Sequence, residues 1–174
     1  FRNQIELGNG TTERWANAVY LVSQKDYSKN LKFDAVRFKS IYRLARHNRL
    51  ALDPALYLGY KLKADSEKAD EMEGRLVLSK DVRRNHYAYN IIVEKRLASG
   101  QSYRHGYALG WARDTNFGAL GVEVYGSYSD RTHQIAPVVA FPFGKKNWWV
   151  AALVFPLNGR SQPVTLRTAL KFKW

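Results

Sequence analysis

The sequence predicts an all-β fold in which antiparallel strands run up and down and close into a barrel. Three observations predict it. The last eleven residues, 164–174, alternate without a break between apolar side chains and cationic or small ones, which is the period-two pattern of a strand. About eleven such segments fill the chain, and none has the period of a helix. Their length suits a tilted strand that crosses a bilayer, so we expect a transmembrane β-barrel.

Length and composition fit a single domain over residues 1–174. The 174 residues suffice for about ten to twelve strands, at roughly fifteen residues per strand and turn. The chain has no cysteine, which excludes disulfides and thiolate metal sites. No apolar run approaches the ~18 residues of a membrane helix. A membrane barrel is still possible, because its apolar residues come at every second position.

The expected strands are short segments separated by polar or basic turns. They occupy residues 1–8, 15–23, 31–46, 56–63, 71–79, 86–97, 103–112, 117–128, 133–143, 148–157 and 164–174. Pro54 lies near the start of the fourth strand, where a missing N–H is tolerated. Strands joined in sequence by short turns predict a meander of hairpins, and closure of the meander removes its edges.

Alternation assigns two faces to each of the first eight strands. The apolar face, expected to point outward, carries Ile5 and Leu7; Ala16, Ala18, Tyr20 and Val22; Val36, Phe38, Ser40, Tyr42 and Leu44; Leu56, Leu58, Tyr60 and Leu62; Met72, Gly74, Leu76 and Leu78; Tyr87, Tyr89, Ile91 and Val93; Tyr107, Leu109 and Trp111; and Leu120, Val122 and Val124. Large apolar residues that alternate with cationic ones are hard to place in a soluble core. They suit a wall between lipid and a polar interior.

Two neighbouring segments, 133–143 and 148–157, are apolar on both faces. Burial on both faces means that this sector also packs something apolar inside the barrel or against a partner. An alternative function is therefore a path for a hydrophobic substrate, lined by Val138, Ala140, Val150, Ala152 and Val154.

The turns fall into two sets. Tight basic turns lie at 47–49, 80–85, 113–116 and 144–147, and longer polar loops lie at 24–30, 64–70, 98–102 and 158–162. Membrane barrels have short periplasmic turns and longer outer loops. Single-chain bacterial barrels have an even number of strands, so we expect a twelfth strand before Phe1 in the intact protein.

The closing segment resembles the last strand of bacterial outer-membrane β-barrel proteins, in which alternating apolar residues precede a terminal aromatic residue. The segments from Leu7 to Trp15 and from Leu52 to Leu58 are also similar to a broad set of small outer-membrane proteins. The resemblance implies that Leu170, Phe172 and Trp174 form the C-terminal assembly signal, with Trp174 in place of the usual Phe. It implies a bacterial outer-membrane location, and the lipid bilayer, lipopolysaccharide and the barrel-assembly machinery as partners.

The net charge of +13 first suggests a nucleic-acid or anionic-surface partner. Nucleic-acid binders gather Lys and Arg on one face or one helix. Here the basic residues alternate with apolar ones along many strands or cluster in turns. The pattern therefore argues against nucleic acid as a partner.

If the apolar face meets lipid, the charged face lines the lumen. The basic lumen residues expected are Arg37, Lys39, Arg43, Lys61, Lys63, Arg75, Arg96, Arg167 and Lys171. The acidic ones are Glu6, Glu71, Glu73, Glu94 and Glu123.

An excess of basic residues inside a barrel predicts a small passive channel that favours anions. The alternative is a non-conducting barrel whose lumen is filled by side chains, acting as a scaffold or as a subunit of an envelope complex. Unpaired buried charge is costly, so a filled lumen should balance its charges, and the excess favours the channel. In a third alternative, a soluble lipocalin-like binder, the apolar face would point inward and Arg37, Lys39 and Arg167 would face solvent.

The sequence gives little indication of an enzyme. The four histidines, at 47, 86, 105 and 133, show no zinc-protease spacing and belong to no Gly-x-Ser-x-Gly motif. Outer-membrane phospholipases have a similar architecture and use a serine with a histidine on the lipid face, whereas His86 falls on the inner face without a neighbouring serine. We therefore expect neither catalytic residues, cofactor nor metal.

Aromatic residues near the strand ends are typical of the belts found at membrane interfaces. This set comprises Trp15, Tyr42, Tyr60, Tyr87, Tyr107, Trp111, Tyr128, Trp149 and Trp174. Ordinary strand propensity explains any one of them equally well, since Tyr and Trp favour strands.

Overall fold

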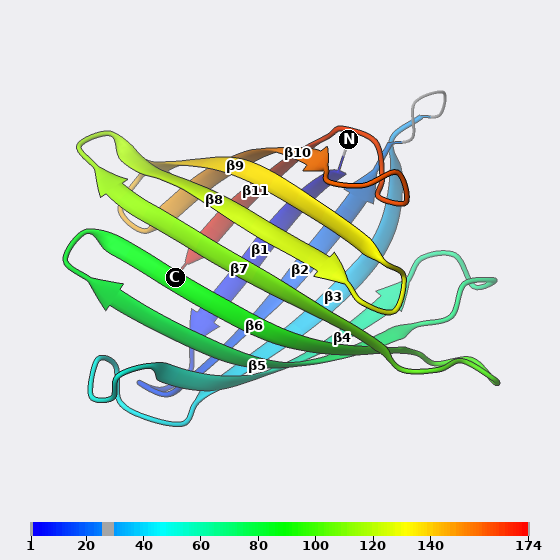
Figure 1. Ribbon diagram of the computed structural model, residues 1–174, viewed down its shortest axis with the longest axis horizontal. Coiled ribbons are helices and arrows are strands. Elements are labelled where there is room, and N and C mark those ends of the chain that lie inside the picture. Colours follow the sequence, from blue (N-terminus) through cyan, green and yellow to red (C-terminus); the bar gives the residue numbers. More distant parts are fainter. Residues whose placement is uncertain (1, 26–29, 174) are drawn as a thin grey trace.

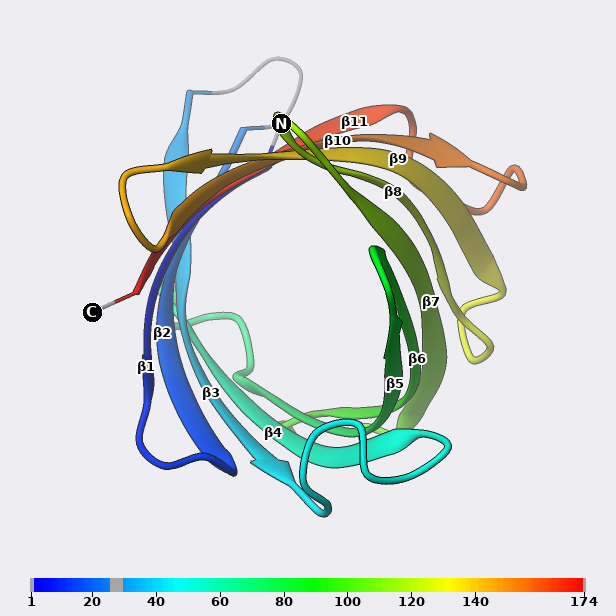
Figure 2. The same cartoon turned by 90° about the vertical axis from the view of Figure 1, so that its left-hand side faces the viewer.

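The computed structural model describes residues 2–25 and 30–173, which form a closed barrel of eleven strands without a helix (Figures 1 and 2). The strands are β1 (Arg2–Gly10), β2 (Trp15–Gln24), β3 (Lys32–Arg43), β4 (Asp53–Lys63), β5 (Glu71–Val82), β6 (Asn85–Arg96), β7 (Arg104–Thr115), β8 (Gly118–Ser127), β9 (Thr132–Phe143), β10 (Asn147–Pro156) and β11 (Thr165–Lys173). The predicted all-β barrel is confirmed.

Each strand pairs antiparallel with the next along the chain, as expected for a meander. The closing pair differs: β1 and β11 run parallel, in register from Arg2↔Arg167 to Gly8↔Lys173. In an up-and-down chain with an odd number of strands, the first and last strands point the same way, so their pairing has to be parallel. The expected twelfth strand concerns residues before Phe1 and stays a prediction.

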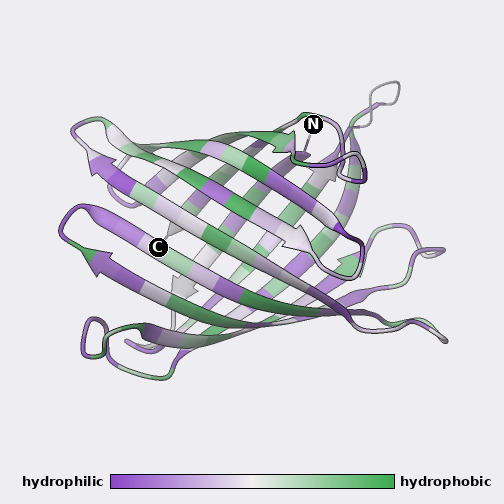
Figure 3. Cartoon of the chain, viewed as in Figure 1, coloured by the Kyte–Doolittle hydropathy of each residue, from purple (hydrophilic) through white to green (hydrophobic). Residues whose placement is uncertain are grey.

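The outer wall of the barrel is apolar. Leu58 at the middle of β4 is 66% exposed, and Phe38 and Leu109 are each nearly half exposed. Apolar and polar residues alternate along the strands in Figure 3. The charged residues of the alternating pattern point into the barrel, where Arg37, Lys39 and Arg167 line a cavity. This orientation is the reverse of the lipocalin-like alternative, which placed the apolar side chains inside.

The faces expected for β2 were wrong. Tyr20 lies opposite Glu6 and lines the internal cavity, Val22 is fully buried, and Trp15 is 46% exposed on the outer side. Ala16 and Ala18 share the inward face with Tyr20, because residues two apart point the same way. Both faces of this strand lack charge, so alternation alone gave no direction.

A β-bulge changes the start of β3. Ser23 pairs with Phe33 while Val22 pairs with Ala35, which leaves Asp34 as an extra residue on β3. Phe33 is exposed on the outside, Ala35 is fully buried, and Asp34 lines the interior cavity. The bulge lets two successive residues face inward, which strict alternation forbids.

A small apolar cluster lies inside the sector that is apolar on both faces. It consists of Ala136, Ala152 and Val154, with Val138 and Tyr125 packed against them. Val150 lies nearby and lines the cavity. Of the residues expected to line a hydrophobic path, Val138, Ala152 and Val154 belong to this packed cluster, whereas Val150 lines the charged cavity.

The connections separate into two ends. The turn end carries the connections 11–14, 44–52, 83–84, 116–117 and 144–146, and the loop end carries 64–70, 97–103, 128–131 and 157–164 (left and right in Figure 1). The 83–84 turn is shorter than expected, with Arg83 at φ +56° as a tight hairpin needs. The 44–52 connection is longer than expected, because β3 already ends at Arg43.

Aromatic side chains gather on the outer face near both ends. Near the turn end the outer face carries three register pairs: Trp15 with Tyr42, Tyr87 with Trp111, and Trp149 with Phe141. Near the loop end the rings of Tyr107 and Tyr128 lie 5.0 Å apart. We call these residues the aromatic belts. Trp174, also expected in this set, lies outside the described residues.

Candidate functional site

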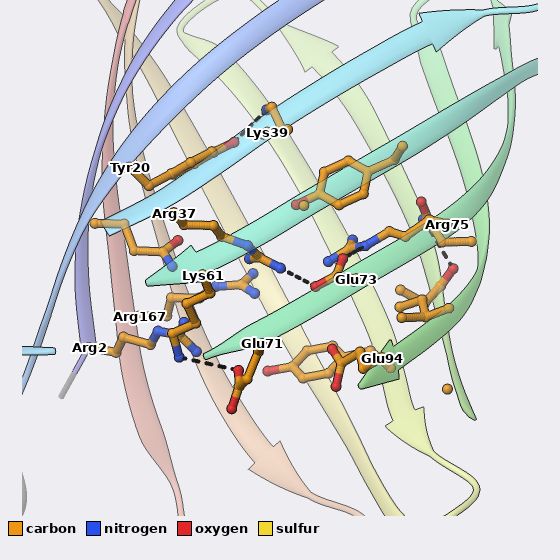
Figure 4. A pocket seen from close by; sticks show the side chains of 18 of the residues that line it. Arg2, Tyr20, Arg37, Lys39, Lys61, Glu71, Glu73, Arg75, Glu94 and Arg167 are labelled. Carbon is orange, nitrogen blue, oxygen red and sulfur yellow. Dashed lines mark hydrogen bonds and ion pairs between the residues drawn. The ribbon is translucent and has the colours of Figure 1, made fainter. Parts of the chain in front are cut away.

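The inside of the barrel contains a cavity of about 830 Å³ that is lined by charged and tyrosine side chains from nearly all the strands (Figure 4). Inward-facing positions of neighbouring strands stand side by side, so residues far apart in sequence meet across the lumen. This charged lumen is the candidate functional site.

Most of the residues predicted for the lumen line this cavity. The basic ones are Arg37, Lys39, Lys61, Lys63, Arg75, Arg167 and Lys171, and the acidic ones are Glu6, Glu71, Glu73, Glu94 and Glu123.

Two predicted basic residues lie outside the cavity lining. Arg43 is the last residue of β3 and is exposed at the turn end. Arg96 is the last residue of β6, and its side chain is 52% exposed, with its Nε 3.8 Å from Glu71 Oε1. Both were assigned by alternation, which gives a face but not a height along the barrel.

The predicted assembly signal is placed in part. Leu170 lies opposite Trp149, and Phe172 makes an edge contact with Phe143 at 5.7 Å between ring centroids. Trp174 lies outside the described residues.

Glu73 is the central acceptor of the lumen. It is 8% exposed and accepts hydrogen bonds from Arg37 Nη2 and Arg75 Nε. The Tyr57 ring lies beneath both guanidinium groups, with Arg75 4.7 Å and Arg37 6.0 Å from its centroid. Tyr57 lies over Gly59, where a Cβ would come within 2.8 Å of its hydroxyl, so a larger residue at position 59 would displace the Tyr57 ring. The Glu73 carboxylate thus joins β5 to β3 through Arg37, across β4, whose Tyr57 ring lies under both cations.

Glu6 likewise forms ion pairs with two cations, here next to the parallel β1–β11 pair that closes the barrel. Its carboxylate lies 2.8 Å from Lys39 Nζ and 3.9 Å from Lys171 Nζ. The Lys39 ammonium also donates to the Tyr20 hydroxyl. These contacts connect β1 to β3 on one side and to β11 on the other.

A third group lies nearer the loop end. Lys61 Nζ is 3.3 Å from Asp34 and 3.7 Å from Glu71, and Lys63 Nζ is 3.6 and 4.0 Å from the same two carboxylates. Two lysines therefore share two carboxylates. The bulge that turns Asp34 inward supplies half of the negative charge here.

Sequence reasoning missed part of the lining. Besides Asp34, the cavity is lined by Arg2, Arg104, Tyr20, Tyr57 and Tyr125. Arg2 and Tyr57 stand on the predicted polar faces, so alternation contains the signal for them. Nothing in the sequence marks the bulge at Asp34.

The lumen retains a net positive charge. Among the described residues, nine basic side chains, Arg or Lys, and six acidic ones line the cavity, an excess of three positive charges. The predicted residues, nine basic and five acidic, give an excess of four. Arg2 and Arg104 take the place of Arg43 and Arg96, and Asp34 lowers the excess by one.

A chain of alternating carboxylates and imidazoles crosses the turn end. His47 Nδ1 is 3.1 Å from Asp53 and its Nε2 is 3.2 Å from Asp81. His86 Nδ1 is 2.7 Å from Asp81 and its Nε2 is 3.0 Å from Asp114. Carboxylates only accept hydrogen bonds, so each imidazole donates on both sides only when it is protonated. The chain ties the 44–52 connection to β4, β5, β6 and β7.

Two loop-end carboxylates outside the strands are held ionised. The Tyr60 hydroxyl, at 2.5 Å, and the Lys63 backbone N–H, at 2.9 Å, donate to Asp70 and lower its pKa. Burial pushes the pKa of Asp130 upward, but hydrogen bonds from Ser127 and Arg104 outweigh it and leave that pKa lowered. Both contacts fix the loops next to the lumen's mouth.

Residues 2–25 and 30–173 contain no cluster of histidine and carboxylate side chains arranged to hold a metal ion. Within the same part of the chain, no helix is long and apolar enough to cross a membrane. Comparison with protein-family models, with curated proteins and with solved structures gives no match for this chain.

Proposed function

We propose that this protein is a bacterial outer-membrane β-barrel that acts as a small passive channel with an anion-favouring lumen. The observation that carries the proposal is the combination of an apolar outer wall with a charged interior cavity of about 830 Å³ that holds three excess positive charges. A membrane barrel needs both surfaces in this orientation. Its partners would be the bilayer, lipopolysaccharide and the barrel-assembly machinery.

Strand length and the aromatic belts support the membrane part of this proposal. The strands have nine to twelve residues, against about 9–11 needed to cross a bilayer with a tilt. Trp15 donates its indole N–H to Ser40 at 2.7 Å, so an apolar ring and a polar contact lie together, as at a membrane interface.

The excess of positive charge supports anion preference. Basic side chains around a pore lower the energy of a passing anion and raise that of a cation. Arg2, Arg37 and Arg167 all lie along the cavity wall.

The ion pairs favour a second candidate, a non-conducting barrel that serves as a scaffold or subunit of an envelope complex. Eleven strands lie between the roughly eight that side chains fill and the roughly sixteen that leave a channel. Contacts such as Arg37–Glu73 and Lys39–Glu6 hold side chains across the lumen. Conductance separates the two candidates.

The test is ion conductance in a planar bilayer under a KCl gradient. We expect discrete conductance steps and a reversal potential on the chloride side. Neutralising two lumen charges in Lys61→Gln with Lys63→Gln lowers the excess from three to one and should move the reversal potential toward zero.

A matched control is Lys145→Gln with Lys146→Gln in the exposed 144–146 turn, which should leave the reversal potential unchanged. Folded protein that inserts into bilayers without any conductance would contradict the channel and favour the scaffold. A cation preference in the unaltered protein would contradict the proposed selectivity.

A further inference from the structure

Two arginines face each other across the seam that closes the barrel. Arg2 on β1 and Arg167 on β11 are register partners in the parallel pair, and both line the cavity. Like charges on directly opposed strand positions repel. This placement therefore favours a negative charge between them.

The two arginines differ in their partners. Arg167 Nη2 donates to Glu123, and its guanidinium lies 5.8 Å from the Tyr125 ring. Arg2 forms no ion pair with any described carboxylate, and its Nε is buried without a hydrogen-bond partner. An unpaired Nε such as that of Arg2 is uncommon, since buried polar groups are nearly always hydrogen-bonded.

The carboxylates around Arg2 are already engaged. Charged neighbours of Arg2 include Asp34 and Glu71, and each of these serves both Lys61 and Lys63. Its other charged neighbours, Arg37 and Arg167, are cations. The three excess positive charges of the lumen thus include a guanidinium that forms no ion pair with a carboxylate of the described residues.

We propose that Arg2 and Arg167 form a binding site for a small oxyanion of the phosphate class. A guanidinium is a planar fork of N–H donors that matches the oxygens of phosphate, and two such forks can hold opposite sides of one tetrahedral anion. The cavity of about 830 Å³ has room for a phosphate group and its ester. Both arginines lie in the first three residues of their strands, at the loop end of the lumen.

The phosphate site depends on the proposed function in one respect: the lumen has to be open to the ligand at the loop end. It makes the lumen selective: chloride can pass any cationic wall, whereas phosphate gains hydrogen bonds from two guanidinium groups at this point. A binding site near a mouth also raises the local concentration of the ion that the channel would carry.

The test is titration of inorganic phosphate into the full chain folded in detergent, by calorimetry at low ionic strength. We expect saturable binding to the unaltered protein and at least tenfold weaker binding to Arg2→Gln and to Arg167→Gln. Arg2→Lys keeps the charge but loses the fork, so it should bind with intermediate affinity. Arg160→Gln removes an equal charge from the exposed 157–164 loop and should bind as the unaltered protein does.

Arg2→Gln should fold, because it removes a charge that pairs with no carboxylate in the part of the chain that the structure describes. Equal affinity of Arg2→Gln and the unaltered protein for phosphate would overturn the site. Displacement of bound phosphate by an equal concentration of chloride would overturn it too. Conductance of the same samples separates the two proposals. Conductance without phosphate binding overturns the site alone, and phosphate binding without conductance overturns the channel alone.

Discussion

Leu58→Arg is expected to lower the free energy of unfolding by about 2–4 kcal/mol when the protein is folded into lipid vesicles. Leu58 is the sixth of eleven residues in β4, and its side chain is 66% exposed on the outer wall. A guanidinium at the middle of a bilayer loses its hydration, and lipid chains offer no hydrogen bonds or charges that would replace it. Leu76→Arg on β5 should act in the same direction. Equilibrium unfolding in urea measures both effects.

The control is Leu50→Arg, in the 44–52 connection, where the leucine is 51% exposed. The same substitution outside the strands should change the stability by less than about 0.5 kcal/mol. If Leu58→Arg and Leu76→Arg are as neutral as Leu50→Arg, the outer wall does not meet lipid.

Glu73→Gln is expected to cost about 3 kcal/mol, by removing the charge that Arg37 and Arg75 share. Breaking a buried ion pair leaves its partner uncompensated, at a cost of about 3–5 kcal/mol. We take the lower end because the two arginine side chains keep 20% and 25% exposure toward the lumen. Glutamine keeps the size of the side chain, so the change reports on charge. The midpoint of urea unfolding gives the measurement.

Asp65→Asn serves as the control, because Asp65 and Lys68 form an exposed pair at 3.2 Å in the 64–70 loop. Water and salt screen exposed pairs, so they contribute little to stability. A loss from Glu73→Gln no larger than that from Asp65→Asn would mean that water screens the lumen charges, and the three lumen groups would not stabilise the barrel.

Charge made the faces of most strands predictable. In β3 and β4, leucine and phenylalanine alternate with arginine and lysine, so only one orientation keeps the charged side chains away from the apolar surroundings. In β2 no charged residue alternates with Ala18, Tyr20 and Val22, and the predicted faces were wrong. A tyrosine can lie on either face, because its ring is apolar and its hydroxyl can bond to a lysine, as Tyr20 does with Lys39.

Local geometry limited the prediction of the lumen itself. Strict alternation cannot place Asp34, since one extra residue in the bulge changes the parity of everything before it. Alternation also does not tell where a strand ends, which is why Arg43 and Arg96 were assigned to the lumen. The pairing of Arg2 with Arg167 depends on the parallel seam, and that seam follows from an odd strand number that periodicity alone does not fix.

The non-conducting barrel and the channel assign different roles to the charged groups of the lumen. Glu6, Glu73 and the Lys61–Lys63 group join strands across the interior, which stabilises a closed barrel whether or not ions pass. Arg2 forms no ion pair with a described carboxylate, and we propose that it binds an anion in the lumen.

We propose that the apolar wall of this closed barrel lies in an outer membrane. The most direct measurement is electrophoretic mobility of the detergent-solubilised protein, boiled against unboiled, together with its fractionation from cells. We expect a heat-dependent shift in mobility, with the protein only in detergent extracts of the envelope. Protein that stays soluble without detergent and shows no shift would contradict the claim.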